Sequence, residues 1–315
     1  MEKNSRVYVA GGETLIGAAI LRELERQRYT NIVGKPGEEP DLTDARALDD
    51  FFSRQLPEYI FMAAGKSGGI EANLKYPAQL MIDNLLVACH VINSAYRYGV
   101  KKLLYLASSC SYPKHCPQPM RVESLLTGPL EPTNEAYAVA KIAGIKLCQA
   151  YREQYGANFV VGIPANVFGP GDDFSLEDSH VIAGLIRRIY LAKTSGAVSV
   201  KIWGTGTPRR EFIFVDDLAD ASVFVMQRYD GAEPINLGGG IDLSISELAE
   251  MIKEVVGYSG ELRYDANRPD GMPLKVLDSS KLSKMGWQPT TPFRVAITAT
   301  YDTFLQKQRE LMNVR

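Results

Sequence analysis

A tyrosine and a lysine four residues apart are the part of this sequence best suited to proton transfer. Tyr137 and Lys141 lie in a stretch rich in alanine, isoleucine and leucine that contains no proline from residue 135 to residue 163. If this stretch is a helix, both side chains project from one face. A lysine ammonium beside a phenol favours the phenolate and lowers the tyrosine pKa, which makes the tyrosine a usable proton donor and acceptor near neutral pH. With 16 tyrosines in the chain, about one Tyr-x-x-x-Lys pair is expected by chance. The pair therefore indicates catalysis only together with the residues around it.

Ser108 directly follows an apolar segment, residues 103–106, that is typical of a buried strand. At the carboxyl end of that strand, its hydroxyl could polarise a substrate carbonyl that Tyr137 protonates. Cys110 comes two residues later. A free cysteine is more often a small buried hydrophobic residue than a catalytic one, so the residues by themselves leave both roles open.

The bulk composition is that of an ordinary globular protein, with 315 residues, 45% hydrophobic and 23% charged, and a net charge of −2. This length suffices for one large α/β domain or two interleaved ones. The small net charge argues against nucleic acid and acidic membranes as partners, and no apolar run is long enough to span a bilayer. Residues 1–6 leave no room for a signal peptide, and the four cysteines are irregularly spaced, so we expect a cytoplasmic protein with reduced thiols.

Strand-like and helix-like segments alternate over the first 164 residues. Strands are expected at 7–10, 31–34, 59–65, 102–106 and 159–164, and helices at 14–28, from 41–44 onward, at 79–98 and from 135 to near 156. Asp41 or Thr43 is expected to cap the second helix, Gly156 to end the fourth, and residues 66–77 to form a loop. This alternation predicts an α/β fold with a doubly wound parallel sheet (Rossmann).

After residue 169 the pattern becomes rich in loops. Helices are expected at 179–192, 246–256 and 292–310, a strand at 262–264, and at 212–217 a strand that enters a helix and rejoins the first domain. We therefore predict a dinucleotide-binding domain of residues 1–169 plus about 211–240. A smaller, interleaved α+β substrate-binding domain would comprise residues 170–210 plus about 241–315.

The turn after the first strand, residues 11–17, has glycine at its first, second and last positions. Strand, glycine turn and helix in this order open a dinucleotide-binding βαβ unit, whose helix N-terminus holds a pyrophosphate. Thr14 occupies the middle position, where glycine normally lets the backbone approach the ligand, but it still offers an amide and a hydroxyl. A tight turn without a ligand is an equally good interpretation of this segment alone.

Charges near the second strand bear on the choice of cofactor. That strand ends in Gly34 and Lys35, without a carboxylate to hold a ribose 2′-hydroxyl, and Lys35 favours a 2′-phosphate. Glu13 argues the other way if it lies near that phosphate. The balance favours NADP(H).

Several longer motifs give the chain a family resemblance. They are KSGGI (66–70), SSCSYPK (108–114), LEPTNEAYAVAKIAG (130–144), SHVI (179–182), WGTGTPRREF (203–212) and PDG (269–271). Through them the sequence, from about residue 6 to its end, resembles the GDP-L-fucose synthases, GDP-4-keto-6-deoxy-D-mannose 3,5-epimerase/4-reductases of the extended short-chain dehydrogenase/reductase superfamily.

The resemblance implies that NADPH supplies hydride to C4 of a 4-keto sugar. Tyr137 would protonate the new oxygen, Lys141 would hold the nicotinamide ribose and tune Tyr137, and Ser108 would hydrogen-bond the substrate carbonyl. Before that step the 4-keto group acidifies C3 and C5, and Cys110 and His180 match the family's epimerisation base and acid. A thiolate beside an imidazolium is accessible near neutral pH.

Binding residues follow from the same resemblance. The GDP-sugar is expected at Asn166, Arg188, Trp203, Arg210 and Lys275, with the arginines on the diphosphate. The cofactor is expected at Gly11, Gly12, Thr14, Leu15, Ile16, Gly17, Lys35, Ala63, Ala64, Tyr137, Lys141, Pro164, Asn166, Val167 and His180. Without the resemblance, His180 could be a surface residue and Trp203 a core residue. No metal is expected, because the cysteine and histidine near residue 115 lack a fourth ligand and a usual spacing.

The chain departs from the family at residues 12–14, which read Gly-Glu-Thr where members usually have His-Arg-Gly, with the arginine associated with the 2′-phosphate. Two other functions are therefore considered. One is a related GDP-4-keto-sugar epimerase or reductase, acting on a deoxyheptose or a dideoxyhexose with altered reduction or cofactor use. The other is a non-catalytic dinucleotide-sensing protein, against which the five intact catalytic positions argue. The resemblance also implies a homodimer through the helices at 79–98 and 135–155.

Overall fold

The computed structural model describes residues 1–175, 179–268 and 270–313. Pro269, part of one family motif, lies outside these residues. Within them, six parallel strands form the larger sheet, in the order β2-β1-β3-β4-β5-β9. The strands are β1 (Val7–Ala10), β2 (Ile32–Val33), β3 (Tyr59–Met62), β4 (Lys102–Leu106), β5 (Phe159–Pro164) and β9 (Ile235–Leu237). The strand order reverses between β1 and β3, so the predicted doubly wound fold is confirmed.

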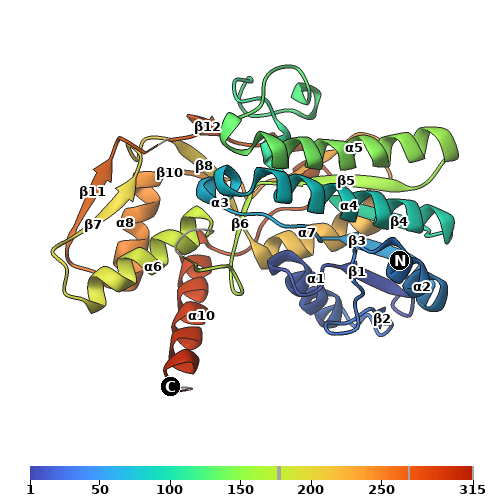
Figure 1. Cartoon of the computed structure of the whole chain (residues 1–315), viewed down its shortest axis with the longest axis horizontal. Helices are drawn as coiled ribbons and strands as arrows, with labels where there is room; N and C mark the ends of the chain where they lie inside the picture. Colours follow the sequence, from blue (N-terminus) through green and yellow to red (C-terminus); the bar gives the residue numbers. More distant parts are fainter. Residues whose placement is uncertain (176–178, 269, 314–315) are drawn as a thin grey trace.

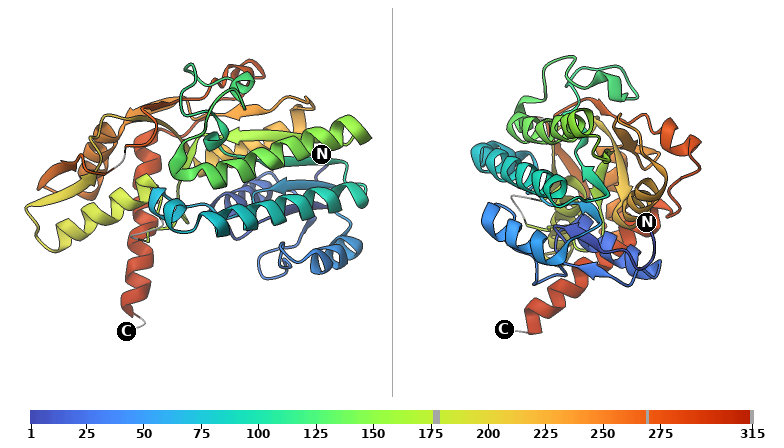
Figure 2. Two further views of the ribbon diagram at one scale, coloured as in Figure 1. Left: turned by 45° about the horizontal axis from the view of Figure 1, so that its top comes forward. Right: turned by 90° about the vertical axis from the view of Figure 1, so that its right-hand side faces the viewer.

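Helices cover both faces of this sheet, as the end-on view in Figure 2 shows. One face carries α2 (Ala45–Gln55), α4 (Pro77–Arg97) and α5 (Glu135–Tyr155), and the other carries α1 (Leu15–Arg26) and α7 (Val215–Arg228). Because both faces are covered, the strands are almost entirely apolar and buried. Gly156 ends α5 in the left-handed conformation, as predicted.

Two local predictions were wrong. Asp44, and not Asp41 or Thr43, is the N-cap of α2, and its carboxylate accepts hydrogen bonds from the amides at positions 46 and 47. The Asp41 carboxylate instead accepts from the amide and hydroxyl of Thr43, which closes a turn before the helix. The expected loop 66–77 contains the short helix α3 (Ile70–Lys75), which packs against α4 and the 3₁₀ turn η3 (Pro132–Asn134).

The rest of the chain builds smaller sheets beside the carboxyl ends of the main strands (Figure 1). β8 (Arg209–Phe214) pairs with β6 (Asn166–Phe168), β10 (Ile241–Ser244) and β12 (Leu274–Lys275), and β7 (Ser199–Trp203) pairs with β11 (Glu261–Asp265). The helices here are α6 (Val181–Thr194), α8 (Ile245–Val256), α9 (Ser280–Lys284) and α10 (Phe293–Asn313). The strand predicted to rejoin the first domain, β8, belongs to this second sheet, whereas the helix that follows it, α7, packs on the main sheet.

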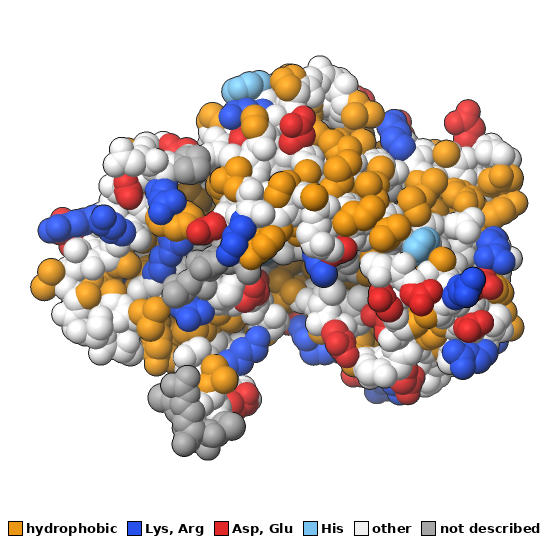
Figure 3. Space-filling model, in the orientation of Figure 1, with side chains coloured by type: hydrophobic (Ala, Val, Ile, Leu, Met, Phe, Trp, Pro, Cys, Tyr) orange, Lys and Arg blue, Asp and Glu red, His pale blue; other side chains and the backbone are white. Residues whose placement is uncertain are grey.

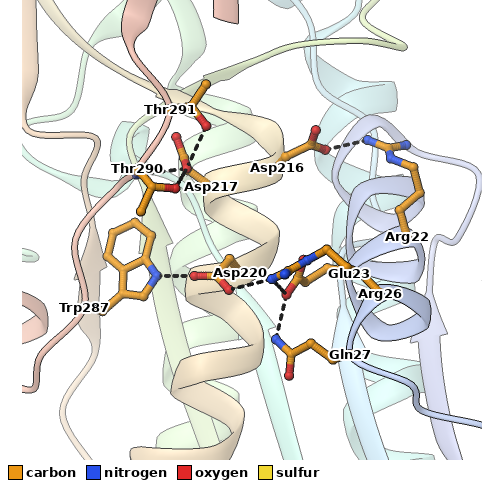
Figure 4. A network of polar contacts seen from close by, with 10 residues as sticks. All are labelled: Arg22, Glu23, Arg26, Gln27, Asp216, Asp217, Asp220, Trp287, Thr290 and Thr291. Atoms are coloured by element: carbon orange, nitrogen blue, oxygen red, sulfur yellow. Dashed lines mark hydrogen bonds and ion pairs between the residues drawn. The ribbon is translucent and has the colours of Figure 1, made fainter.

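Two hydrophobic cores accompany these sheets, one around the main sheet and one among α6, α8, α10 and β8. From them we propose the interleaved division into a dinucleotide-binding and a substrate-binding domain. Figure 4 shows how the segment before α10 is attached to α7: Asp220 accepts a hydrogen bond from the indole of Trp287, which packs in the main core, at 2.7 Å, and Asp217 accepts from the hydroxyl of Thr291 at 3.0 Å. Among the described residues, no helix combines the length and apolar character needed to cross a membrane.

Candidate active site

A cavity of about 520 Å³ lies between the carboxyl ends of β4 and β5 and the second sheet. It brings together most of the residues predicted from the sequence: Thr14, Leu15, Ile16, Ala63, Ser108, Cys110, Tyr137, Pro164, Asn166, Val167, His180, Arg188, Trp203, Arg210 and Lys275. The other predicted residues, Gly11, Gly12, Gly17, Lys35, Ala64 and Lys141, do not line it. Thr14, Leu15 and Ile16 after β1 and Ala63 after β3 extend the cavity to the switch in strand order, where a doubly wound fold binds its ligand.

Ser108 and Tyr137 reach this cavity from separate elements. Ser108 caps the 3₁₀ turn η1 (Ser109–Ser111) after β4, and Tyr137 lies in the first turn of α5. The prediction that Lys141 lowers the pKa of Tyr137 was wrong for this structure. Burial raises the pKa of Tyr137, the nearby Cys110 adds to this increase, and the Ser108 hydroxyl only partly opposes it.

Lys141 lies one turn further along α5 and is itself buried. Its Nζ is 5.9 Å from the centre of the Tyr137 ring and donates a hydrogen bond to the carbonyl of Leu106 at 3.3 Å. Burial lowers the pKa of Lys141 to about 8. The buried Lys141 is therefore less readily protonated, and its ammonium is too far from the phenol to offset the effect of burial on the pKa of Tyr137.

Two donors from other segments of the chain contact the sulfur of Cys110. Its Sγ accepts hydrogen bonds from Asn134 Nδ2 at 3.2 Å and from Lys275 Nζ at 3.3 Å. Burial by itself would raise the pKa of the Cys110 thiol, but the charge of Lys275, hydrogen bonding and the charge of Arg210 together lower it. The cation beside the thiol is therefore Lys275, and not the histidine that the sequence suggested.

His180 lies at the N-cap of α6, and its Nε2 is 3.3 Å from the hydroxyl of Ser67. Burial lowers the pKa of His180, Lys275 lowers it further, and Asp173 opposes both. The imidazole is thus less readily protonated than a free histidine near neutral pH. It lines the same cavity as Cys110 but comes from the second part of the chain.

The glycine turn is shaped by close backbone contacts. Gly11 has a φ of +81°, and a Cβ on Gly17 would lie 1.9 Å from the carbonyl oxygen of Gly11. Thr14 uses its polar groups inside the turn, since its amide and its hydroxyl both donate to the Gly11 carbonyl and its hydroxyl also accepts from the Gly17 amide. The groups left for a ligand are the amides of Leu15 and Ile16, which have no acceptor within the helix. The turn therefore fits a pyrophosphate despite the threonine.

The far end of the cavity carries positive charge and one aromatic ring. Two guanidinium groups lie over the ring of Trp203, that of Arg188 at 4.3 Å and that of Arg268 at 4.6 Å from the ring centre. Arg210 donates to the carbonyl of Asp270 at 3.0 Å, and burial lowers its pKa and that of Arg188. Partly buried cations of this kind are suited to hold a diphosphate.

Some residues of the site were missed from the sequence. Asn134 and Arg268 are among them, and so is Asp172, a buried carboxyl that lines the cavity. Asn134 stands in the LEPTNEAY motif, which could have drawn attention to it. Arg268 and Asp172 lie in polar loop segments, and neither stands in a motif or at a spacing that would predict a functional role.

Comparisons with known proteins find relatives among the enzymes that modify nucleotide sugars. The model of the NAD dependent epimerase/dehydratase family matches residues 7–238. GDP-L-fucose synthase 1 of Arabidopsis thaliana is 52% identical over 305 residues, which cover 97% of this chain and 94% of that protein.

Two solved structures have the same overall shape. A GDP-6-OMe-4-keto-L-xylo-heptose reductase from C. jejuni superposes with a TM-score of 0.92 at 33% identity, covering 98% of this chain and 99% of its own. A GDP-L-fucose synthetase from Naegleria fowleri bound to NADP superposes with a TM-score of 0.89 at 28% identity, covering 98% and 96% of the two chains. The fold, the cavity and these similarities together describe a nucleotide-sugar site beside a dinucleotide site.

Proposed function

The chain belongs to the NAD dependent epimerase/dehydratase family and, within it, to the GDP-L-fucose synthases, and we propose that it converts GDP-4-keto-6-deoxy-D-mannose to GDP-L-fucose. The reaction consists of epimerisation at C3 and C5 followed by NADPH-dependent reduction at C4. The observation that carries the proposal is the convergence of a lysine-paired thiol, a histidine and a Ser-Tyr pair on one cavity.

The dinucleotide fits the residues present. The α1 N-terminus with the amides of Leu15 and Ile16 would hold the pyrophosphate, and Lys141 would hold the nicotinamide ribose. Ala63, Pro164 and Val167 line the adjoining wall of the cavity. When bound, the cofactor would supply the hydride that reduces C4, and the related synthetase from Naegleria fowleri is described bound to NADP.

Epimerisation comes first because the 4-keto group makes the protons at C3 and C5 acidic. Cys110, as thiolate, removes the proton, and the electron pair moves into the C4 carbonyl to give an enolate. His180, in its protonated form, returns a proton to the opposite face of the same carbon and restores the carbonyl, and its lowered pKa makes that form a stronger acid. Lys275 and Asn134 favour the thiolate through their contacts with Sγ.

Reduction then requires one hydride and one proton. Ser108 donates a hydrogen bond to the C4 oxygen, and Tyr137 gives that oxygen its proton as the carbonyl becomes an alcohol. The raised pKa of Tyr137 keeps its phenol protonated and therefore available as the proton donor. Arg188, Arg210 and Trp203 would hold the GDP part of the substrate.

One assay tests this function. The protein is incubated with GDP-4-keto-6-deoxy-D-mannose in D₂O, with and without NADPH, and nucleotide oxidation and deuterium at C3 and C5 are followed. We expect exchange in both cases and oxidation only with NADPH, whereas exchange without oxidation would point to an epimerase. Cys110→Ala should abolish exchange while the matched variant Cys116→Ala keeps it. Inertness toward this sugar and toward GDP-4-keto heptoses would overturn the proposal.

We also propose a homodimer formed through α4 and α5. Figure 3 shows hydrophobic side chains gathered over these helices, and the exposed ones include Ile82, Tyr96, Val139 and Tyr155. Exposed apolar groups on two adjacent long helices are suited to a self-complementary interface. Val139→Glu should yield monomers in analytical ultracentrifugation, and Val198→Glu, at an exposed position before β7, should not. A monomeric wild-type protein would refute this interface.

The cytoplasm is the compartment we propose for this chemistry. All four cysteines, each in the described part of the chain, are free, and the role of Cys110 requires a reduced thiol. A reducing compartment keeps such a thiol available. Fractionation of the source cells should find the protein with the cytoplasmic enzymes.

A further inference from the structure

The adenosine end of the dinucleotide site carries unusual charges. In a doubly wound fold the glycine turn after β1 and the loop after β2 together meet the adenosine ribose, whose 2′ position distinguishes NAD(H) from NADP(H). A carboxylate there accepts a hydrogen bond from a 2′-hydroxyl, whereas a cation accommodates a 2′-phosphate. The charges that this chain places on the two segments therefore bear on which nucleotide it binds.

Glu13 links the two segments directly. It is exposed in the glycine turn, and its Oε1 accepts a hydrogen bond from the amide of Gly37, in the loop after β2, at 3.1 Å. This contact holds the carboxylate against the loop that meets the ribose. A negative charge in this position opposes a second negative charge on the ligand.

A second carboxylate contacts the glycine turn. The Oε1 of Glu39 accepts hydrogen bonds from the hydroxyl of Tyr8 at 2.6 Å and from the amide of Gly11 at 2.8 Å. Burial raises the pKa of Glu39, and the charge of Glu13 contributes to this increase. Glu39 thus places a second acidic side chain on the glycine turn, while Glu13 carries the exposed carboxylate.

Lys35 places a positive charge in the loop that holds Glu39 and contacts the carboxylate of Glu13. Lys35 is exposed immediately after β2, and in the described part of the chain it forms no ion pair with either carboxylate. Its side chain is free to meet a 2′-phosphate. An adenosine ribose bound between the glycine turn and the loop after β2 would thus meet the carboxylate of Glu13 and the ammonium of Lys35.

We propose that Glu13 makes this subsite permissive, so that the chain binds NADH with an affinity comparable to that for NADPH. The inference rests on the dinucleotide site of the proposed function and adds to it the residue that sets the choice between the two nucleotides. Glu13 accepts a hydrogen bond from the 2′-hydroxyl of NADH and weakens the binding of the 2′-phosphate. Lys35 compensates part of this loss for NADPH.

The test measures binding and not turnover. Dissociation constants for NADH and NADPH are determined by isothermal titration on the full-length protein, at low and at physiological salt. We expect the two wild-type constants to agree within about tenfold. Removing one unit charge beside a phosphate at a partly solvated site changes affinity by roughly tenfold, so Glu13→Gln should tighten NADPH by about that factor and weaken NADH. Lys35→Gln should weaken NADPH by a similar factor and leave NADH unchanged.

Glu38→Gln is the matched control, since it removes the same charge from an exposed position in the same loop. It should change neither constant by more than about twofold. A wild-type preference for NADPH of roughly a hundredfold or more, or a Glu13→Gln variant with an unchanged ratio, would overturn the inference. A protein that binds both nucleotides as expected but leaves every GDP-4-keto sugar untouched would refute the proposed function and leave this inference standing.

Discussion

Lys275 offers the sharpest test of how the site produces a reactive thiol. Lys275→Met keeps the length and most of the apolar stem of this buried side chain and removes the ammonium that lies 3.3 Å from Cys110 Sγ. The pKa of Cys110 is held below that of an ordinary thiol, against the opposing effect of burial. Removing the cation should raise this pKa, and the thiolate fraction near neutral pH should fall.

The size of the effect follows from the distance. For unit charges 3.3 Å apart, Coulomb's law gives about 1.3 kcal/mol at the dielectric constant of water and about 5 kcal/mol at an effective value of roughly 20. Because Cys110 is only partly buried and Arg210 also contributes, we take about 1.5 to 3 kcal/mol, a rise of roughly one to two pKa units. The thiolate fraction below that pKa should then drop by about ten- to a hundredfold.

The assay is the pH dependence of alkylation of the free enzyme by iodoacetamide, with the modified cysteine identified by peptide mass. Cys116 and Cys148 serve as internal references, because burial raises the pKa of both. Lys275→Arg should keep the low pKa of Cys110, and Lys281→Met, which removes an ammonium paired with Glu233, should leave it unchanged. Deuterium exchange at C3 and C5 should fall with the thiolate fraction.

An unchanged alkylation profile in Lys275→Met would refute this reasoning. So would a wild-type profile with the pKa of an unperturbed thiol. If alkylation shifted as expected while exchange stayed constant, Lys275 would tune the thiol but Cys110 would not be the base.

Three further predictions concern other parts of the site. Tyr137→Phe should lose NADPH oxidation by about a hundredfold or more while deuterium exchange persists, and parallel losses would refute the separation of the two steps. Burial raises the pKa of Asp172 to about 7, so its carboxyl ionises in the unfolded chain before it does in the folded one, and stability should fall as pH rises from about 4 to about 7. Asp172→Asn should therefore raise the unfolding free energy by up to about 4 kcal/mol at pH ~8 and leave it unchanged at pH ~4 in denaturant titrations; an equal gain at both would contradict this. Gly17→Ala forces a Cβ to 1.9 Å from the Gly11 carbonyl, so it should lower the melting temperature, with a loss of about 3 kcal/mol, and weaken binding of both nucleotides; unaltered melting would show that the turn can relax.

The order of strands and helices in the first half of the chain could be predicted from the sequence. Buried parallel strands need near-continuous apolar runs, and the helices between them need an apolar stripe, so residues 7–164 carry both signals without reference to any distant residue. The position of Ser108 at a strand end and of Tyr137 early in a helix followed from the same local rules. The N-cap of α2 did not, because Asp41, Thr43 and Asp44 offer similar side chains and the turn geometry selects among them.

The smaller strands were harder to predict. β6, β10 and β12 are two to four residues long, and each depends on β8 for its hydrogen bonds. A strand of that length has no periodicity of its own, so its existence is decided by the strand that it meets.

The sequence by itself determined which chemical groups are available and which local elements carry them. Only the tertiary structure decided what lies next to each group. It placed Lys275 against Cys110 across 165 residues of chain, and buried Tyr137 deeply enough that its pKa rises despite the lysine one turn away. It also brought the carboxylate of Glu13 onto the loop after β2. The physical reason is that a pKa depends on burial and on charges within a few ångströms, and these distances exist only after distant segments have packed together.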